Sequence, residues 1–307
     1  MKRLTFALAL GALLLLVMAT AWAWSEIGPR FVATACTAGL ALVTGLLFFE
    51  DRLVFRPSRR PVGRWLPQDL AAEERTFSTQ DGYQLHGWWC PGGGDEDPAK
   101  RPVLLWSHGS SGNVTHSAAA ARALAAQGFA FLLFDYRGYG KSQGRPSEHG
   151  LYLDGEAAYR HLVEQLAVAP RRIVCFGQGL GSTVALHVAL LRKTAGVMLE
   201  GAQEDAEGLA RGRLVLLPLV KFGRNRFDNA TRVRKLKVPL LMAHGEKDQR
   251  VPLELARAVF GPAPQPKQFH MIEGAGHGDA FEHGGPPYWA VLRRFCDECL
   301  ARARERR

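Results

Sequence analysis

Residues 173–181 read IVCFGQGLG, and this stretch decides the fold. Its first four residues form an apolar run without alternation, which is typical of a parallel strand covered on both faces. The glycines that follow favour a tight turn, and the apolar residues 180–191 favour a helix. In an open parallel sheet such a turn lies at the carboxyl ends of the strands, where ligands bind. The stretch therefore predicts a strand, a site-bearing glycine turn and a helix.

Similar patterns alternate on both sides of this stretch. Eight strands are predicted at residues 74–79, 83–89, 103–107, 129–134, 173–176, 196–199, 239–244 and 269–272. Helices are predicted at residues 118–127, 151–166, 180–191 and 254–260. Asp81-Gly82 is a strong hairpin signal, so the sheet should begin antiparallel and continue parallel. Right-handed crossovers then predict an α/β fold, a mostly parallel eight-stranded sheet with helices on both faces.

Four loops that follow predicted strands carry the candidate chemistry. They are residues 108–113, the glycine turn 177–181, the loop that contains Asp248 and the loop that contains His277. An acidic residue before a histidine, both after a strand, glycine turn and helix, is the chain order of an acyl-transfer triad. The four loops should meet at one edge of the sheet.

From residue 73 to residue 295 the chain resembles the α/β-hydrolase superfamily. It is most similar to membrane-associated α/β-hydrolase-domain proteins related to monoacylglycerol lipases and serine aminopeptidases. The matching residues are Asp81-Gly82, Leu85 to Trp88, His108-Gly109, Gly112-Asn113, Phe134 to Ser142, Pro146 to Glu148, His244-Gly245, Asp248, Val251-Pro252 and Gly276-His277. The resemblance implies a serine hydrolase that acts as an esterase, acylhydrolase or peptidase, without a cofactor or a metal.

The resemblance also assigns roles to individual residues. Asp248 would be the acid of the triad and His277 the general base. Backbone N–H groups near Ser110 and at Leu180 would form the oxyanion hole. The nucleophile elbow of the family reads Gly-x-Ser-x-Gly, which corresponds here to Gly177, Gln178, Gly179, Leu180 and Gly181.

Gly179 departs from the family at the position of the nucleophile. Glycine has no side-chain atom that can attack a carbonyl, so covalent catalysis should be impaired. The elbow normally forces its central residue to positive φ, at a cost of about 1–3 kcal/mol for other residues. Glycine relieves that strain. The sequence therefore predicts a retained fold in a pseudoenzyme that still binds acyl, ester or peptide ligands.

Several substitutes for the missing hydroxyl can be weighed. Ser182 is one turn into the helix and is expected to bond to the preceding turn, and Cys175 is expected to be a buried strand residue. Ser110 and Ser111 lie in the oxyanion loop and are expected to point away from His277. A second hypothesis is an active hydrolase in which a His277–Asp248 dyad activates water.

A third hypothesis is a nucleotide-binding protein. Gly177, Gly179 and Ser182 approach the dinucleotide fingerprint, with Glu200 near the position of the ribose contact. Ser182 replaces the third glycine, and the motif lies deep in the chain, so this interpretation is the weaker one. Gly140-Lys141-Ser142 is no phosphate loop, because Asp135 occupies the place of its first glycine.

The first fifty residues are predicted to be a membrane anchor. Uncharged apolar runs cover residues 4–24 and 31–49, each long enough to cross a bilayer core. Basic residues flank the pair of runs at Lys2, Arg3, Arg52, Arg56, Arg59, Arg60 and Arg64. The positive-inside rule then predicts a hairpin with both ends, and the soluble domain, in the cytoplasm. The alternative is a cleaved signal peptide with one remaining span.

Domain boundaries follow from these patterns. We expect an anchor at residues 1–52, a linker at 53–72, the hydrolase domain at 73–300 with a small lid at 201–238, and a basic tail at 301–307. Residues 211–237 hold nine Lys or Arg against Asp228 alone, and the whole chain carries a net charge of +10. Membrane lipids, in particular anionic ones, are the expected partners, and no nucleic acid is expected.

Composition excludes several other classes. With 47% hydrophobic and 22% charged residues the chain is neither disordered nor collagen-like. Its five cysteines suggest no disulfide framework, which favours a reducing compartment. Cys296 and Cys299 have no second cysteine pair and fall in a helical pattern, so they are expected to be ordinary helical thiols.

Overall fold

The computed structural model describes residues 11, 13–18, 27–94, 97–203 and 223–305. The chain divides into two compact units, one of residues 1–50 and 212–224 and one of residues 51–211 and 225–307. Each unit is described by itself.

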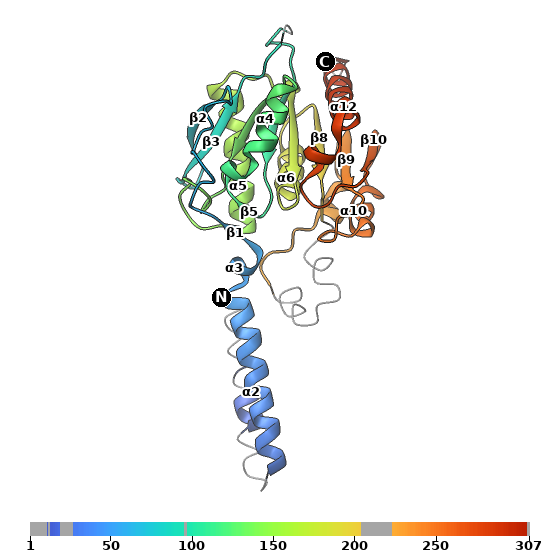
Figure 1. Ribbon diagram of the computed structural model, residues 1–307. Helices are drawn as coiled ribbons and strands as arrows, with labels where there is room; N and C mark the ends of the chain where they lie inside the picture. Colours follow the sequence, from blue (N-terminus) through green and yellow to red (C-terminus); the bar gives the residue numbers. More distant parts are fainter. Residues whose placement is uncertain (1–10, 12, 19–26, 95–96, 204–222, 306–307) are drawn as a thin grey trace. The chain divides into compact units, whose positions relative to one another are not determined.

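The larger unit is built on an eight-stranded sheet in the order β10-β9-β8-β7-β4-β6-β3-β2 (Figure 1). The strands are β2 (Glu73–Ser78), β3 (Gln84–Cys90), β4 (Val103–Ser107), β6 (Ala130–Phe134), β7 (Ile173–Gln178), β8 (Gly196–Glu200), β9 (Leu240–Gly245) and β10 (Lys267–Ile272). Pairings of β2 with β3 and of β3 with β6 are antiparallel, and the other five are parallel. The predicted α/β fold and its mostly parallel sheet are confirmed.

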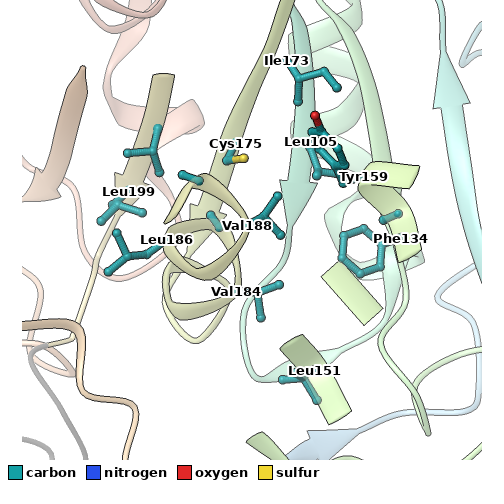
Figure 2. Close-up of a cluster of buried hydrophobic side chains, with 14 of the residues drawn as sticks. Leu105, Phe134, Leu151, Tyr159, Ile173, Cys175, Val184, Leu186, Val188 and Leu199 are labelled. Carbon is teal, nitrogen blue, oxygen red and sulfur yellow. The ribbon is translucent and has the colours of Figure 1, made fainter. Parts of the chain in front are cut away.

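Helices cover both faces of this sheet. The principal ones are α4 (Ala118–Ala126), α5 (Glu148–Arg160), α6 (Gly181–Leu191), α9 (Asn229–Val233), α10 (Leu253–Phe260), α11 (Ala280–His283) and α12 (Gly285–Glu305). The side chains of successive β4 residues lie in two different hydrophobic cores, one on each face of the sheet, because side chains alternate across a strand. Leu105 packs with α5 and α6 in one cluster, part of which Figure 2 shows, whereas Leu104 packs with α4 and α12 in the other.

Three boundaries differ from the sequence-based expectations. The helix predicted at 151–166 begins earlier, at Glu148, where the Ser147 side chain accepts the Gly150 N–H, and it passes into a π-helical turn at residues 161–165. The expected tail from residue 301 continues α12 to Glu305, because no helix breaker interrupts this stretch. The expected linker 53–72 contains β1 (Arg56–Pro57), which pairs with β5 (Ser111–Gly112) beside the buried Phe55.

In the smaller unit, α2 (Ile27–Phe48) is the main described element. Its residues 30–48 are long and apolar enough to cross a membrane. The Thr37 hydroxyl lies 3.1 Å from the Met18 sulfur, so the two predicted apolar runs touch at this point. Most of the predicted first span, residues 4–24, lies outside the described residues, and so do residues 204–222 of the predicted lid 201–238.

Candidate active site

The glycine turn between β7 and α6 forms a sharp elbow. Gly179 at its centre has a φ of +51°, which side-chain-bearing residues rarely adopt. A Cβ on Gly177 would collide with the backbone carbonyl of Gly181, and one on Gly181 would collide with the carbonyl of Ser107. Glycines 177 and 181 are therefore needed for the close crossing of strand and helix.

Asp248 and His277 meet beside this elbow. They follow β9 and β10, and His277 Nδ1 lies 2.8 Å from Asp248 Oδ2. The other carboxylate oxygen, Oδ1, accepts the N–H groups of Arg250 and Val251 at 2.8 and 2.9 Å. Burial by itself would raise the pKa of Asp248, but these hydrogen bonds and the one from His277 outweigh it and hold the pKa below its usual value. Asp248 is thus an ionised group that orients the imidazole.

The free side of the imidazole faces the centre of the elbow. A Cβ built on Gly179 would lie 3.2 Å from His277 Nε2, and its next contact outside the imidazole would be the Cα of Gly109 at 4.0 Å. Gly201, after β8, makes room for the ring, because a Cβ there would lie 3.3 Å from His277 Cε1. Gly201 is not among the site residues predicted from the sequence, because neighbouring residues do not reveal its φ of +56°.

The loop after β4 lies on the other side of the elbow. Its Ser110 carbonyl accepts the Arg56 N–H and the Tyr139 hydroxyl, both at 2.9 Å, so β1 and the residues after β6 hold this loop. Leu180 follows Gly179 directly and is the N-cap residue of α6. Both residues expected to supply oxyanion donors, Ser110 and Leu180, therefore belong to segments that border the centre of the elbow.

Two of the alternative nucleophiles are occupied or inaccessible. The Ser182 hydroxyl is fully buried and donates to the carbonyl of Gly177 at 3.0 Å, which confirms the expected bond to the preceding turn. Cys175 is fully buried in β7, and burial raises the pKa of its thiol far above the usual value. Neither group can supply a nucleophile to the elbow.

A series of hydrogen bonds between polar side chains holds the elbow in place. The Trp106 indole donates to Gln178 Oε1 at 2.8 Å, and Gln178 Nε2 donates to Glu200 Oε1 at 2.9 Å. The Tyr288 hydroxyl donates to the other oxygen of Glu200 at 2.7 Å, and Gly179 N–H donates to the Glu200 carbonyl at 2.9 Å. Because the Glu200 carboxyl group is buried and both its oxygens are engaged, it is not available to a ribose, as the nucleotide hypothesis requires.

Glu200→Gln is expected to reduce the pH dependence of stability. Burial raises the pKa of Glu200 above its usual 4.5, so the folded chain keeps a proton that the unfolded chain loses first. The free energy of unfolding should then fall as pH rises from about 4.5 through the raised pKa. An uncharged amide removes this fall. Urea unfolding across that pH range measures it, with the exposed Glu164→Gln as the matched control; an unchanged profile in Glu200→Gln would contradict the assignment.

A second buried carboxylate supports the loop after β4. Asp135 is fully buried, accepts the Val114 N–H at 2.8 Å and lies 3.3 Å from His86 Nδ1. Burial would raise its pKa, but the nearby imidazoles of His108 and His86 and the Val114 N–H keep the pKa below the usual value. This cluster joins β3 and the strand ends to the start of the oxyanion loop.

Among the described residues, no group of three or more His, Cys, Asp or Glu side chains could hold a metal ion. Cys296 and Cys299 are buried in α12, where they pack in the core of the sheet face that α4 also covers. This agrees with their interpretation as helical thiols.

Comparison with known proteins agrees with this architecture. The sequence model of a family described as serine aminopeptidase, S33, matches residues 98–207. The chain is 33% identical over 274 residues to the uncharacterized protein Rv2307c of Mycobacterium tuberculosis, covering 88% of this chain and 96% of that protein. It is 30% identical over 229 residues to the uncharacterized protein YfhR of Escherichia coli K12, covering 71% of this chain and 78% of that protein.

Solved structures show the same fold. The Pyrococcus furiosus esterase Pf2001 superposes with a TM-score of 0.65 at 21% identity, covering 80% of this chain and 97% of that one. An α/β-hydrolase from Vibrio vulnificus superposes with a TM-score of 0.61 at 19% identity, covering 85% and 91%. The sheet, the elbow and the loops around it define an α/β-hydrolase fold. The chain belongs to the α/β-hydrolase superfamily, in the family that it shares with Rv2307c and YfhR.

Proposed function

We propose that this protein is a membrane-anchored α/β-hydrolase-fold protein of the serine hydrolase class that has lost efficient covalent catalysis. The observation that carries the proposal is the geometry at Gly179. The point where a side chain would start lies 3.2 Å from His277 Nε2, yet glycine supplies no atom there. The site is left to bind small acyl, ester or peptide ligands.

The remaining parts of the site support this class. His277, oriented by Asp248 at 2.8 Å, has the arrangement of a general base with its carboxylate. Backbone N–H groups near Ser110 and at Leu180 would stabilise a developing oxyanion and need no serine. Ligand recognition would involve the elbow and the loops that surround it.

The native protein should not be labelled by a fluorophosphonate probe. Such probes phosphonylate an activated serine, and Ser182 is buried and hydrogen-bonded to Gly177. The measurement is gel fluorescence of the purified chain after incubation with the probe, with heat-denatured protein as the background. A covalent adduct on any serine or cysteine, located by peptide mass spectrometry, would refute the loss of the nucleophile.

A second candidate function is hydrolysis by water that His277 activates. It is favoured by the intact His277–Asp248 pair and by the lack of a side chain at Gly179 beside Nε2. In this case native protein turns over an ester such as p-nitrophenyl butyrate without being labelled, and His277→Ala abolishes turnover. Turnover that His277→Ala leaves unchanged would come from elsewhere and would exclude the dyad. Absence of any turnover would favour the first proposal, a protein that binds ligands without catalysis.

Membrane attachment rests on α2. Residues 30–48 are apolar along the length of a bilayer core, and five arginines follow by residue 64. We propose an anchored protein whose soluble unit faces the cytoplasm, with anionic lipids as partners. A signal peptide before a single remaining span is the alternative, and N-terminal sequencing of the membrane fraction separates the two.

A further inference from the structure

A basic hollow lies at the end of the sheet opposite to the elbow. It has a volume of about 520 Å³, and we call it the basic basin. It is lined by the segment before β7 at Pro170 and Arg171, by the end of α6 and the segment before β8, by the segment before β9, and by Arg302 of α12. These are the amino ends of parallel strands, whereas Gly179 and His277 follow carboxyl ends. The basin is therefore separate from the candidate active site.

The described lining of the basin carries charges of one sign. Its charged residues are Arg171, Arg192, Lys193, Lys235, Lys237 and Arg302, and no Asp or Glu lines it within the described part of the chain. A smaller hollow that shares Arg171 adds Lys100, Arg172 and Arg304. Since Asp and Glu number 29 against 39 Lys and Arg in the whole chain, a set of this size without an acid is a local concentration of positive charge.

Only some of the basic residues that line the basin have a structural role. Arg192 forms an ion pair with Glu156, and Arg302 lies in the last turn of α12, where a cation stabilises the helix dipole. Arg171, Lys193 and Lys235 are exposed and form no ion pair with any described residue. Neighbouring like charges of this kind repel one another, so their arrangement costs free energy unless an anion is bound.

Apolar residues also line the basin. Leu190, Leu191 and Val238 line it together with alanines 189, 195 and 303. The Leu191 side chain is 61% exposed, although it lies at the end of an otherwise buried helix. A lining that combines cations with apolar side chains fits a ligand with an anionic head and an apolar group, and the volume of the hollow is in the range of small-molecule sites.

We propose that the basic basin binds an organic phosphate, a phosphate monoester with an apolar substituent. The three cations Arg171, Lys193 and Lys235 carry more charge than one carboxylate can neutralise and suit a dianionic group that accepts several hydrogen bonds. The phosphate would lie among Arg171, Lys193 and Lys235, and the substituent would pack on Leu190 and Leu191. The site does not depend on catalysis at Gly179.

The test uses hexyl phosphate as the probe and the full chain in phosphatidylcholine nanodiscs. Titration calorimetry, corrected with empty nanodiscs, should show saturable binding of hexyl phosphate that is at least about tenfold tighter than that of inorganic phosphate, since two buried methylene groups suffice for this gain. Hexanol should not bind. Equal affinities for hexyl phosphate and inorganic phosphate would overturn the apolar subsite, and absence of saturable binding would overturn the proposal.

Variants separate the basin from the overall positive charge. Lys193→Glu, Lys235→Glu and Arg302→Glu combined should weaken hexyl phosphate binding at least about tenfold. The matched control reverses three exposed arginines outside the basin, Arg145→Glu, Arg257→Glu and Arg294→Glu, and should stay within about twofold. Circular dichroism checks that both variants are folded. Equal weakening in both would show an unspecific charge effect and overturn the site.

Two further measurements identify the place and source of binding. Leu191→Asn should bring the affinity for hexyl phosphate close to that for inorganic phosphate, and His277→Ala should leave it unchanged. Binding that His277→Ala abolishes would assign the ligand to the elbow and refute the basin. Capture of the nanodiscs by vesicles that contain phosphatidic acid, without saturable hexyl phosphate binding, would refute the pocket in favour of a membrane contact.

Discussion

Gly179→Ser is expected to create fluorophosphonate labelling and to raise ester turnover at least about 100-fold over the native chain. In a well-studied serine protease, loss of the nucleophile lowers kcat by about a million-fold, so even partial restoration gives a large gain. The gain should appear in kcat, because the new hydroxyl forms its bond with the substrate in the transition state.

The geometry supports this expectation. The backbone at Gly179 already has the positive φ of a nucleophile elbow, and among the described residues a Cβ there meets only His277 within 3.6 Å. At 3.2 Å from Nε2 that Cβ is close, so the imidazole must withdraw by a few tenths of an ångström. A hydroxyl on this Cβ would then lie within hydrogen-bonding reach of Nε2, while Asp248 keeps the ring oriented.

Two variants serve as controls for this result. His277→Ala added to Gly179→Ser should remove both the labelling and the turnover, because the serine loses its base. Gly82→Ser in the β2–β3 hairpin introduces a serine that is also at positive φ, +88°, where a Cβ has no neighbour within 4 Å among the described residues, and it should gain neither activity. A folded Gly179→Ser protein that is not labelled would show that the oxyanion loop or the imidazole is not competent.

Gly181→Ala should destabilise the protein by about 3 kcal/mol or more, whereas Gly179→Ala should cost only about 1–2 kcal/mol. Both add one methyl group, but the surroundings differ. At residue 181 the methyl meets the backbone carbonyls of Ser107, the last residue of the central strand β4, and of His108 directly after it, and these cannot move without disturbing the end of the strand. At residue 179 it meets an imidazole at the surface of the site, and the main cost is the positive φ.

Urea unfolding followed by tryptophan fluorescence measures the difference. The prediction would also be met if the Gly181→Ala variant did not accumulate as folded protein while the Gly179→Ala variant remained soluble. Equal losses in the two variants would contradict the close crossing of α6 over β4. The comparison also separates the two functions of glycine in this turn, since residue 181 serves packing and residue 179 leaves the nucleophile position empty.

The sequence predicted the framework well for a physical reason. Apolar runs at residues 103–107 and 129–134 correspond closely to β4 and β6, because strands buried on both faces need uninterrupted apolar residues. The Asp81-Gly82 turn and the loops with Asp248 and His277 could also be predicted, since each is marked by a local pattern of neighbouring residues. The pairing of β1 with β5 was not, because two-residue strands have no periodicity and their partners lie 55 residues apart.

Amino-acid order alone determined the fold class, the candidate base and acid, and the empty position at Gly179, because each is written in local patterns or in the identity of one residue. Only the tertiary structure decided how these groups meet. The 3.2 Å approach to His277, the series of hydrogen bonds from Trp106 to Tyr288 and the basic basin join residues far apart in sequence. Such contacts depend on sheet order and crossover, which bring distant segments together through packing that no single segment encodes.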